Sequence, residues 1–224
     1  MKDFKKQLNF DSLMVADSAL YTQENLQLLT DIKWLSRVPV RIKAAHKLVQ
    51  EIDESDFTTS QIKGYRYQEL SKTDGGVQQR WLIVESQLRR ESDLKSLEKK
   101  IQKERVEVDK KLRTLKSEKF ACQPDAETAA RKLFKKFLDH ELTEINFQEV
   151  QSKSESDFSD QLQVKVSLRE SKIELEKKRA GRFILATNVL DQMELTTEEM
   201  LSKYKGQQSV ERGFRFLGIP SIFN

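Results

Sequence analysis

The chain has 224 residues, and its 40 basic and 36 acidic residues give a formal net charge of +4 at pH 7. This near balance fits a polyanion-binding protein without demanding one. The single cysteine excludes an internal disulfide and a cysteine-based zinc site, and the two histidines, His46 and His140, lie in no recognisable catalytic or metal-binding motif. The opening segment MKDFKKQLNF lacks the apolar core of a signal peptide, and no apolar run approaches the ~20 residues of a membrane span, so we expect a cytoplasmic protein with no membrane partner.

Residues 1–53 alternate between strand-like and helix-like patterns. A compact apolar run is typical of a strand, and recurrence of apolar residues at three and four positions is typical of a helix. The expected segments, alternately strand and helix, are 12–16, 23–29, 32–38 and 42–52. This order is typical of an α/β fold. Asp17 directly follows the first strand.

The character of the sequence changes after Asp53. Asp74 and Gly75 separate two strand-like stretches, and Asp-Gly is a strong hairpin signal. The region 89–119 is highly charged, and its heptad pattern is only half filled, which indicates a helix packed on a neighbour in the same chain. The segments expected here are a β-hairpin at 57–88, a helical hairpin at 89–145, a polar linker at 152–159, and a strand and a helix within 161–179.

The last segment predicts a strand at 183–186 followed by a long helix. Thr196 and Glu199 have the spacing of a capping box, in which each side chain binds a free backbone N–H of the first turn. Six later residues recur at steps of three and four, which places them on one helix face: Met200, Tyr204, Gln207, Glu211, Phe214 and Gly218. A carboxylate on such a face is costly unless a positive group meets it, although an ordinary amphipathic helix with one partly exposed glutamate has the same pattern.

Paired carboxylates are the candidate chemistry. No glycine-rich phosphate loop of the GxxxxGK or GxGxxG type occurs, which argues against a kinase or a Rossmann enzyme. Asp17 follows a strand at the edge where α/β proteins bind ligands, and Glu211 lies on a helix that follows another strand. Two such acids at one sheet edge would bind Mg²⁺ and support phosphodiester cleavage, although spacing alone is a weak signal for this.

Three segments carry a further pattern: MVADSALYTQENLQLL at 14–29, KWLSRVPV at 33–40, and GRFILATNVLDQMELTTEEMLSKYKGQQSVERGFRFL at 181–217. Together they resemble bacterial insertion-sequence transposases of the DDE class, in particular the IS-four superfamily with its Tyr–Arg–Glu–Lys helix signature. The resemblance implies an RNase H-like fold in which two aspartates and a glutamate bind two divalent metal ions, Mg²⁺ or Mn²⁺. By position it makes Asp17 the second aspartate, Glu211 the glutamate, and Tyr204 the signature tyrosine that helps to hold DNA near the cut.

The signature is matched in part. Gln207 stands at the arginine position, and an amide can bind a phosphate but cannot neutralise it. Gly218 stands at the lysine position, which removes a phosphate contact. Arg212 and Arg215 flank the face, so the expected DNA-binding residues are Tyr204, Gln207, Arg212 and Arg215.

The first aspartate of the family lies on its first strand, well before the second. Only sixteen residues precede Asp17, and Asp3 and Asp11 lie too close to it to fill that role. The family pattern also ends after Leu217. We therefore expect a truncated, inactive fragment that lacks the first catalytic aspartate and the C-terminal part, and that binds metal weakly or not at all.

The resemblance divides the chain into an RNase H-like core in two parts, 1–53 and 181–224, and an insertion domain at 54–180. The insertion would supply DNA contacts or a dimer surface, and its candidate phosphate ligands are Lys99, Lys100, Lys103, Lys110, Lys111 and Arg113, unless interspersed glutamates neutralise a solvated face. Trp81 is a candidate for base stacking, although its WLIVE context favours the core. Expected partners are DNA at transposon ends and a second copy or an intact transposase. The alternative is a non-catalytic helical interaction or DNA-binding protein.

Overall fold

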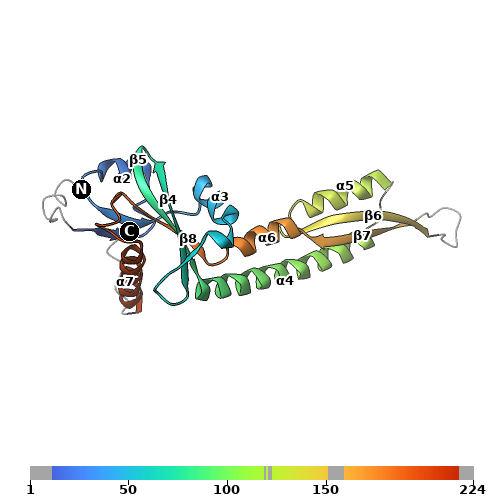
Figure 1. The fold of residues 1–224 in the computed structure, drawn as a ribbon. Helices are drawn as coiled ribbons and strands as arrows, with labels where there is room; N and C mark the ends of the chain where they lie inside the picture. Colours follow the sequence, from blue (N-terminus) through green and yellow to red (C-terminus); the bar gives the residue numbers. More distant parts are fainter. Residues whose placement is uncertain (1–11, 119, 121–122, 151–158, 217–224) are drawn as a thin grey trace. The chain divides into compact units, whose positions relative to one another are not determined.

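A computed structural model describes the backbone of residues 12–118, 120, 123–150 and 159–216, and the side chains of these residues except 147–150, 159–162 and 208–216. The fold is mixed α/β, as expected (Figure 1). The chain divides into two compact units. The first is built from the residues up to Glu91 and from Arg179 onward, and the second is Ser92–Lys178.

A six-stranded mixed sheet forms the centre of the first unit, with the strand order β1-β2-β8-β5-β4-β3. The parallel pair β1–β2 lies at one end of this order, and every other neighbouring pair is antiparallel. The strands are β1 (Met14–Ala16), β2 (Trp34–Arg37), β3 (Thr58–Thr59), β4 (Tyr65–Asp74), β5 (Val77–Ser86) and β8 (Arg182–Thr187).

Both faces of this sheet are covered by helices, which explains why residues 81–84 of β5 and 183–186 of β8 are apolar at consecutive positions. Adjacent residues of a strand point to opposite faces. Trp34, Trp81 and Ile184 belong to one buried cluster, and Leu35, Leu82 and Leu185 belong to the other. Helices α2 (Gln23–Leu28) and α3 (Lys43–Glu51) cover the first face, and α7 (Thr197–Phe216) covers the second.

Trp81 is fully buried. Its indole N–H donates to Gln79 Oε1 at 2.9 Å, and Tyr21 packs edge-on against its ring. The core position is therefore confirmed, and base stacking by Trp81 is excluded in this conformation.

The hairpin predicted from Asp74-Gly75 is confirmed, with ten residues in each of β4 and β5. Gly75 and Gly76 have φ values of +58° and +79°, the left-handed conformation that a tight two-residue hairpin turn requires. The sequence interpretation placed this hairpin in the insertion. In the structure β5 pairs along its length with β8, so the hairpin belongs to the sheet of the first unit. The division of the chain falls after Glu91 because this long-range pairing joins 65–86 to 182–187.

The second unit holds a helical hairpin and a two-stranded sheet. Its elements are α4 (Gln87–Ser117) from Ser92 onward, α5 (Gln123–Phe134), the antiparallel strands β6 (His140–Val150) and β7 (Ser159–Leu168), and α6 (Glu170–Arg179) up to Lys178. The heptad residues Val108 and Leu115 of α4 are buried, and Leu115 packs with Ala126 and Ala130 of α5. The prediction that this helix packs within its own chain is confirmed. Within the described residues, no helix is both long and apolar enough to cross a membrane.

The predicted helical hairpin is too long at its C-terminal end. The second helix ends at Phe134, and residues from His140 form a strand. Leu142 fits the helical spacing, but it pairs with Val166 of β7 and packs on the same core from a strand. The predicted strand and helix at 161–179 are confirmed as β7 and α6. The predicted linker lies outside the described residues, except for Ser159, the first residue of β7.

Candidate functional site

The C-terminal ends of the parallel strands β1 and β2 form the sheet edge at which Asp17 lies. Ala16 is opposite Ser36 in the ladder, so Asp17 and Arg37 are the next residues on neighbouring strands. The hydroxyl of Ser36 donates to the carbonyl oxygen of Asp17 at 2.7 Å, which fixes the backbone of Asp17 to β2. In α/β folds this edge is where ligands bind.

An acid and two arginines share an open groove at this edge. The Asp17 side chain is exposed, and its Oδ1 accepts a hydrogen bond from the N–H of Ala19 at 2.8 Å. A hollow of about 570 Å³ is lined by Asp17 together with Arg37 and Arg41. A carboxylate can bind a divalent cation, and arginine matches the geometry of a phosphate. The groove therefore has the chemistry to hold a metal and a phosphodiester side by side.

Sequence reasoning did not select Arg37 and Arg41. Arg37 is the last residue of β2 and lies inside the KWLSRVPV segment that supports the family resemblance, and Arg41 follows that strand. The usable signal was a basic residue at the C-terminal end of a strand that neighbours the one carrying Asp17. The Arg37 guanidinium also lies 5.6 Å from the centre of the Phe183 ring, which holds it at the sheet edge.

The capping box that begins α7 is confirmed. Thr196 Oγ1 accepts from the N–H of Glu199 at 3.2 Å, and Glu199 Oε2 accepts from the N–H and the hydroxyl of Thr196, both at 2.8 Å. These hydrogen bonds from Thr196 hold the pKa of Glu199 below its ordinary value. The start of α7 is therefore determined locally.

The predicted face of α7 packs against the sheet as far as its side chains are described. Met200 and Tyr204 are buried, and Gln207 is half-buried. The Tyr204 ring lies 5.8 Å from that of Phe183, so it forms part of the core. Its contact with DNA remains a prediction.

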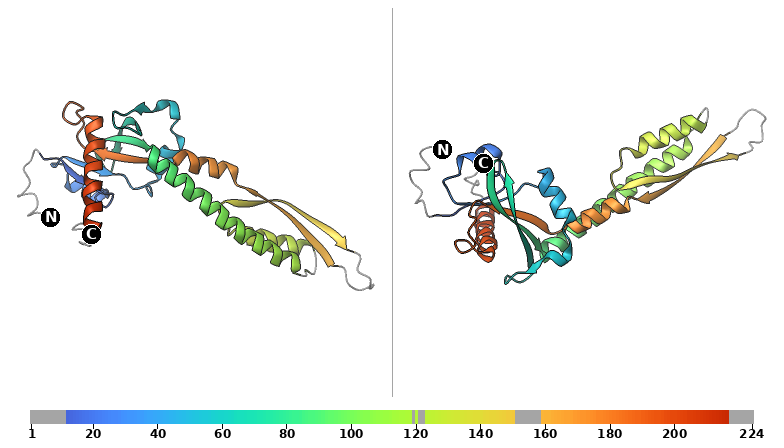
Figure 2. Two further views of the ribbon diagram at one scale, coloured as in Figure 1. Left: turned by 90° about the horizontal axis from the view of Figure 1, so that it is seen from below. Right: turned by 45° about the horizontal axis from the view of Figure 1, so that its top comes forward.

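Helix α7 crosses the sheet toward the strand that carries Asp17. In its first turn, Glu198 accepts hydrogen bonds from Ser60 and Gln61, and Thr197 donates to Glu69 of β4. The helix also contacts β1 and β2, at the other end of the strand order (Figure 2). Its later turns therefore lie on the side of the sheet that carries Asp17.

Those later turns contain Glu211, Arg212 and Arg215. Their backbone is helical, and their side chains lie outside the described residues. The predicted meeting of the Asp17 and Glu211 carboxylates, and the DNA contacts of the two arginines, remain predictions. Among the side chains that are described, no three of His, Cys, Asp and Glu cluster closely enough to hold a metal ion.

An ion pair between the buried Arg80 and the half-buried Glu69 secures the loop that leads into α7. Arg80 donates to both carboxylate oxygens of Glu69, at 3.0 and 2.8 Å, and to the carbonyl oxygens of Val189 and Leu195. Burial raises the pKa of Glu69, but hydrogen bonds from Arg80, Thr197 and Gln192 outweigh it, and the pKa lies below its ordinary value. This pair positions the helix, and sequence reasoning missed it. The available signal was an arginine beside the apolar WLIV run.

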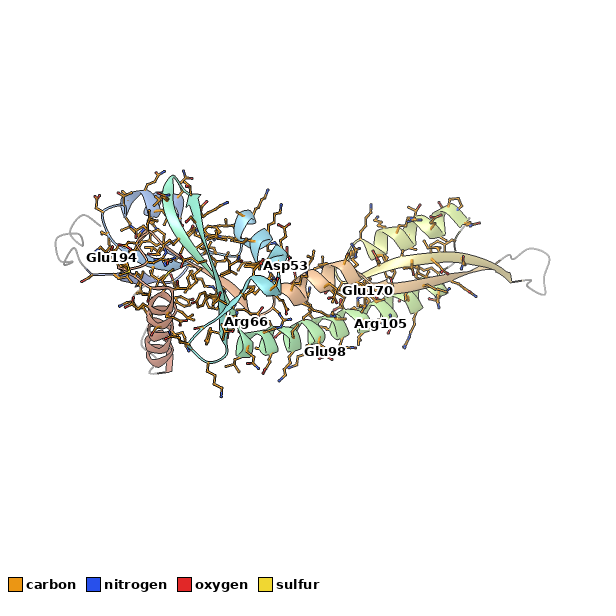
Figure 3. All side chains as sticks on the ribbon, viewed as in Figure 1. Asp53, Arg66, Glu98, Arg105, Glu170 and Glu194 are labelled. Atoms are coloured by element: carbon orange, nitrogen blue, oxygen red, sulfur yellow. The ribbon has the colours of Figure 1, made fainter. Side chains whose placement is uncertain are left out.

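A buried acid, Glu85, joins α3 to the sheet. It accepts from Arg66, which Figure 3 labels, at 2.5 Å and from Arg182 at 3.1 Å. Arg182 also donates to the carbonyl oxygens of Val49 and Ile52. Burial raises the pKa of Glu85, but the hydrogen bonds and charges of Arg66 and Arg182 outweigh this effect. The pKa of Glu85 therefore lies below its ordinary value. We assign this cluster a structural role.

Searches of protein-family models, curated proteins and solved structures find no match to this chain.

Proposed function

We propose that this chain is part of a DDE-class DNA transposase and carries the second aspartate, Asp17, and the glutamate, Glu211, of an RNase H-like catalytic core. The proposal depends on one arrangement above all. The parallel pair β1–β2 ends at Asp17, and α7, which bears Glu211, packs across the same pair. The resemblance implies this relation between the second aspartate and the glutamate helix.

The order of elements along the chain adds support. The RNase H-like part would consist of β1, α2, β2, α3, β8 and α7, and the segment between α3 and β8 would be the insertion. In this proposal β5 and β4 extend the core sheet beyond β8 in the antiparallel sense. The insertion then has two parts, a sheet extension in the first unit and the separate second unit.

The site residues fit a divalent metal in their chemistry. One oxygen of Asp17 accepts the Ala19 N–H, and the exposed carboxylate has further lone pairs for a cation. When bound, Mg²⁺ or Mn²⁺ supplies an activated water and stabilises the leaving oxygen. In this proposal Asp17 and Glu211 hold the metal, and Arg37 and Arg41 orient the phosphodiester.

We propose further that this chain by itself binds DNA but does not cleave it. Gln207 in place of the signature arginine removes a positive charge that would face the scissile phosphate. No described residue takes the role of the first aspartate in the resemblance. In this proposal cleavage needs that aspartate from outside the residues that the structure describes.

Binding of Mn²⁺ to the purified chain tests whether Asp17 and Glu211 form the metal site of a DDE-class transposase. Titration calorimetry should detect weak Mn²⁺ binding that is lost in Asp17→Asn and in Glu211→Gln, and kept in Asp31→Asn, a control outside the groove. Equal affinity in all four proteins would overturn the two-carboxylate site.

A plasmid-nicking assay with Mg²⁺ or Mn²⁺ should show no cleavage. If the wild type nicks the plasmid and Asp17→Ala does not, the proposal that this chain is inactive is wrong. The assignment to the DDE class would then still stand.

The second candidate is a non-catalytic helical protein that binds DNA or a partner. The long, charged α4 of the second unit favours it. DNA binding with no effect of Asp17→Asn on Mn²⁺ affinity would select this candidate over the first.

A further inference from the structure

A groove runs between α4 and α5 within the second unit. Two adjoining hollows, of about 540 and 260 Å³, share Lys111, Leu133 and Lys136 in their walls. One wall is α4 and the other is α5, and Leu115 of α4 packs with Ala126 and Ala130 of α5. We refer to this feature as the α4–α5 groove.

Lysines dominate the rim of the α4–α5 groove. Six line it, and all are exposed: Lys100, Lys103, Lys110, Lys111, Lys132 and Lys136. Lys100 pairs with the buried Asp139 at 2.9 Å. In the described part of the chain, the other five take part in no ion pair.

Two arginines elsewhere on the same helices are paired. Arg105 bonds to Asp109 on α4 at 3.2 Å, and Arg131 bonds to Glu127 on α5 at 2.6 Å (Figure 3 labels Arg105). Inside the groove, Glu104 is already occupied by the N–H of Asp139 at 3.0 Å. Because the unpaired lysines outnumber the remaining glutamates that line the groove, the groove carries an excess of positive charge.

Apolar side chains form the floor of the groove. Leu115 and Phe137 are buried and Leu133 is half-buried, whereas Leu138, at one end, is exposed at 59%. An amphipathic peptide helix binds chiefly through apolar anchors, whereas a polyanion needs only a row of cations. The row of exposed lysines along both walls therefore favours a polyanion.

We infer that the α4–α5 groove binds the phosphate backbone of a nucleic acid, a second contact surface apart from the Asp17 edge; this inference rests on the proposed function. From Lys100 to Lys111 the rim extends over about 16 Å of helix, at ~1.5 Å per residue. Duplex DNA carries on the order of ten phosphates over that length. The contact is electrostatic and independent of base sequence, because lysine is a point charge and reads no base edge in this arrangement.

The test is the salt dependence of binding by the full chain to a fluorescent duplex of arbitrary sequence, followed by anisotropy. The groove variant is the triple substitution Lys103→Gln, Lys111→Gln and Lys136→Gln. A matched control with the same change in charge is Lys95→Gln, Lys116→Gln and Lys178→Gln, because these lysines are exposed and lie outside the groove. At low salt the groove variant should bind roughly 100-fold more weakly, and its slope of log K against log salt should be shallower by about 2 to 3.

Each outcome decides one question. The inference is supported if the groove triple binds DNA more weakly and the control triple binds it like the wild type. Equal loss of DNA affinity in both triples overturns the inference, because only net charge would then matter. Wild-type binding that neither triple changes overturns the groove and leaves the proposed function standing. No binding of duplex or single-stranded DNA by the wild type overturns the proposed function itself. Binding of polyglutamate but not DNA at the groove would assign it to an acidic peptide and overturn the nucleic-acid inference.

Discussion

The hydroxyl of Ser36 on β2 donates a 2.7 Å hydrogen bond to the backbone carbonyl of Asp17, the residue that follows β1. Ser36 is fully buried, so this bond is shielded from water. It joins the two parallel strands at the point where their chains leave the sheet. The position of the candidate metal ligand therefore depends on a neighbouring strand as well as on its own turn.

Removal of this hydroxyl should lower stability and loosen the site. We expect Ser36→Ala to reduce the free energy of unfolding by about 1 kcal/mol, because the hydrogen bond from Ser36 to the carbonyl oxygen of Asp17 is lost. Urea unfolding followed by circular dichroism measures this. The control is Ser71→Ala on β4, whose side chain is exposed. A Ser36→Ala protein as stable as this control would contradict the role assigned to the bond.

The Arg80–Glu69 pair should be far more costly to break than an exposed pair. Arg80→Met leaves Glu69 with less compensation and frees the carbonyls of Val189 and Leu195, so we expect a loss of about 3 kcal/mol or more in the free energy of unfolding.

Lys47→Met provides the comparison for that substitution, because Lys47 and Glu51 form an exposed pair at 3.7 Å in the same unit. Its cost should stay within about 0.5 kcal/mol. Chemical denaturation of both variants, at equal ionic strength, tests the contrast. Similar losses in the free energy of unfolding of the two variants would show that the Arg80–Glu69 pair does not secure the loop before α7.

Acid should destabilise the first unit through Glu69 and Glu85. The pKa of each is lower in the folded chain than its ordinary value of 4.5. The unfolded chain therefore binds more protons as the pH falls, and the stability from these ion pairs is fully present above pH 4.5 and is lost as the pH falls through the folded pKa values.

Urea midpoints measured at a series of pH values from neutral into this acidic range give the slope. In Glu85→Gln one of the two titrating groups is absent, so stability should fall less steeply with acid than in the wild type. Equal slopes in the two proteins would mean that the buried Glu85 cluster contributes nothing to acid denaturation.

Two glycines should respond to alanine in opposite directions. Gly181 has a φ of +79°, and a Cβ there would lie 2.6 Å from the Cβ of Arg90 and 2.7 Å from the carbonyl oxygen of Ser86. Gly181→Ala should therefore lower stability by about 2 kcal/mol or more, through both strain and overlap.

Gly206 lies within α7, and a Cβ there would meet no atom within 4 Å. Gly206→Ala should raise stability by about 0.5 to 1 kcal/mol, because alanine is the better helix former. Thermal unfolding of both variants tests the pair. A stabilised Gly181→Ala protein would be incompatible with the close packing of β8 on the start of α4.

Local sequence patterns were sufficient for several elements. The Asp74-Gly75 turn, the capping box at Thr196 and the early strand–helix order depend on residues within a few positions of each other, and all three are present in the structure. The buried face of α7 also follows from spacing, for Met200 and Tyr204. Patterns of this range are determined by backbone geometry and capping, which act over one or two turns.

Two features were missed because they depend on contacts between residues that are far apart in the sequence. The strand character of β6 was missed because Leu142 faces the core at a spacing that suits a helix as well as a strand. The pairing of the hairpin with β8 was not predicted, because its hydrogen bonds link residues about one hundred positions apart, such as Trp81 and Ala186. The roles of Arg80 and Arg182 were missed for the same reason, since their partners lie on distant segments.

The sequence by itself determined the α/β character, the turn at Asp74, the start of α7 and the face that α7 buries, because each depends on neighbours in the chain. Only the tertiary structure decided which strands share the first sheet, how α7 crosses toward the strand of Asp17, and where unpaired lysines gather between α4 and α5. Those features come from side chains and backbone groups that meet only after the chain has closed long loops. The free energy needed to close such a loop, and the free energy gained from the contacts that it permits, depend on residues far apart in the chain. No short stretch of residues therefore predicts them.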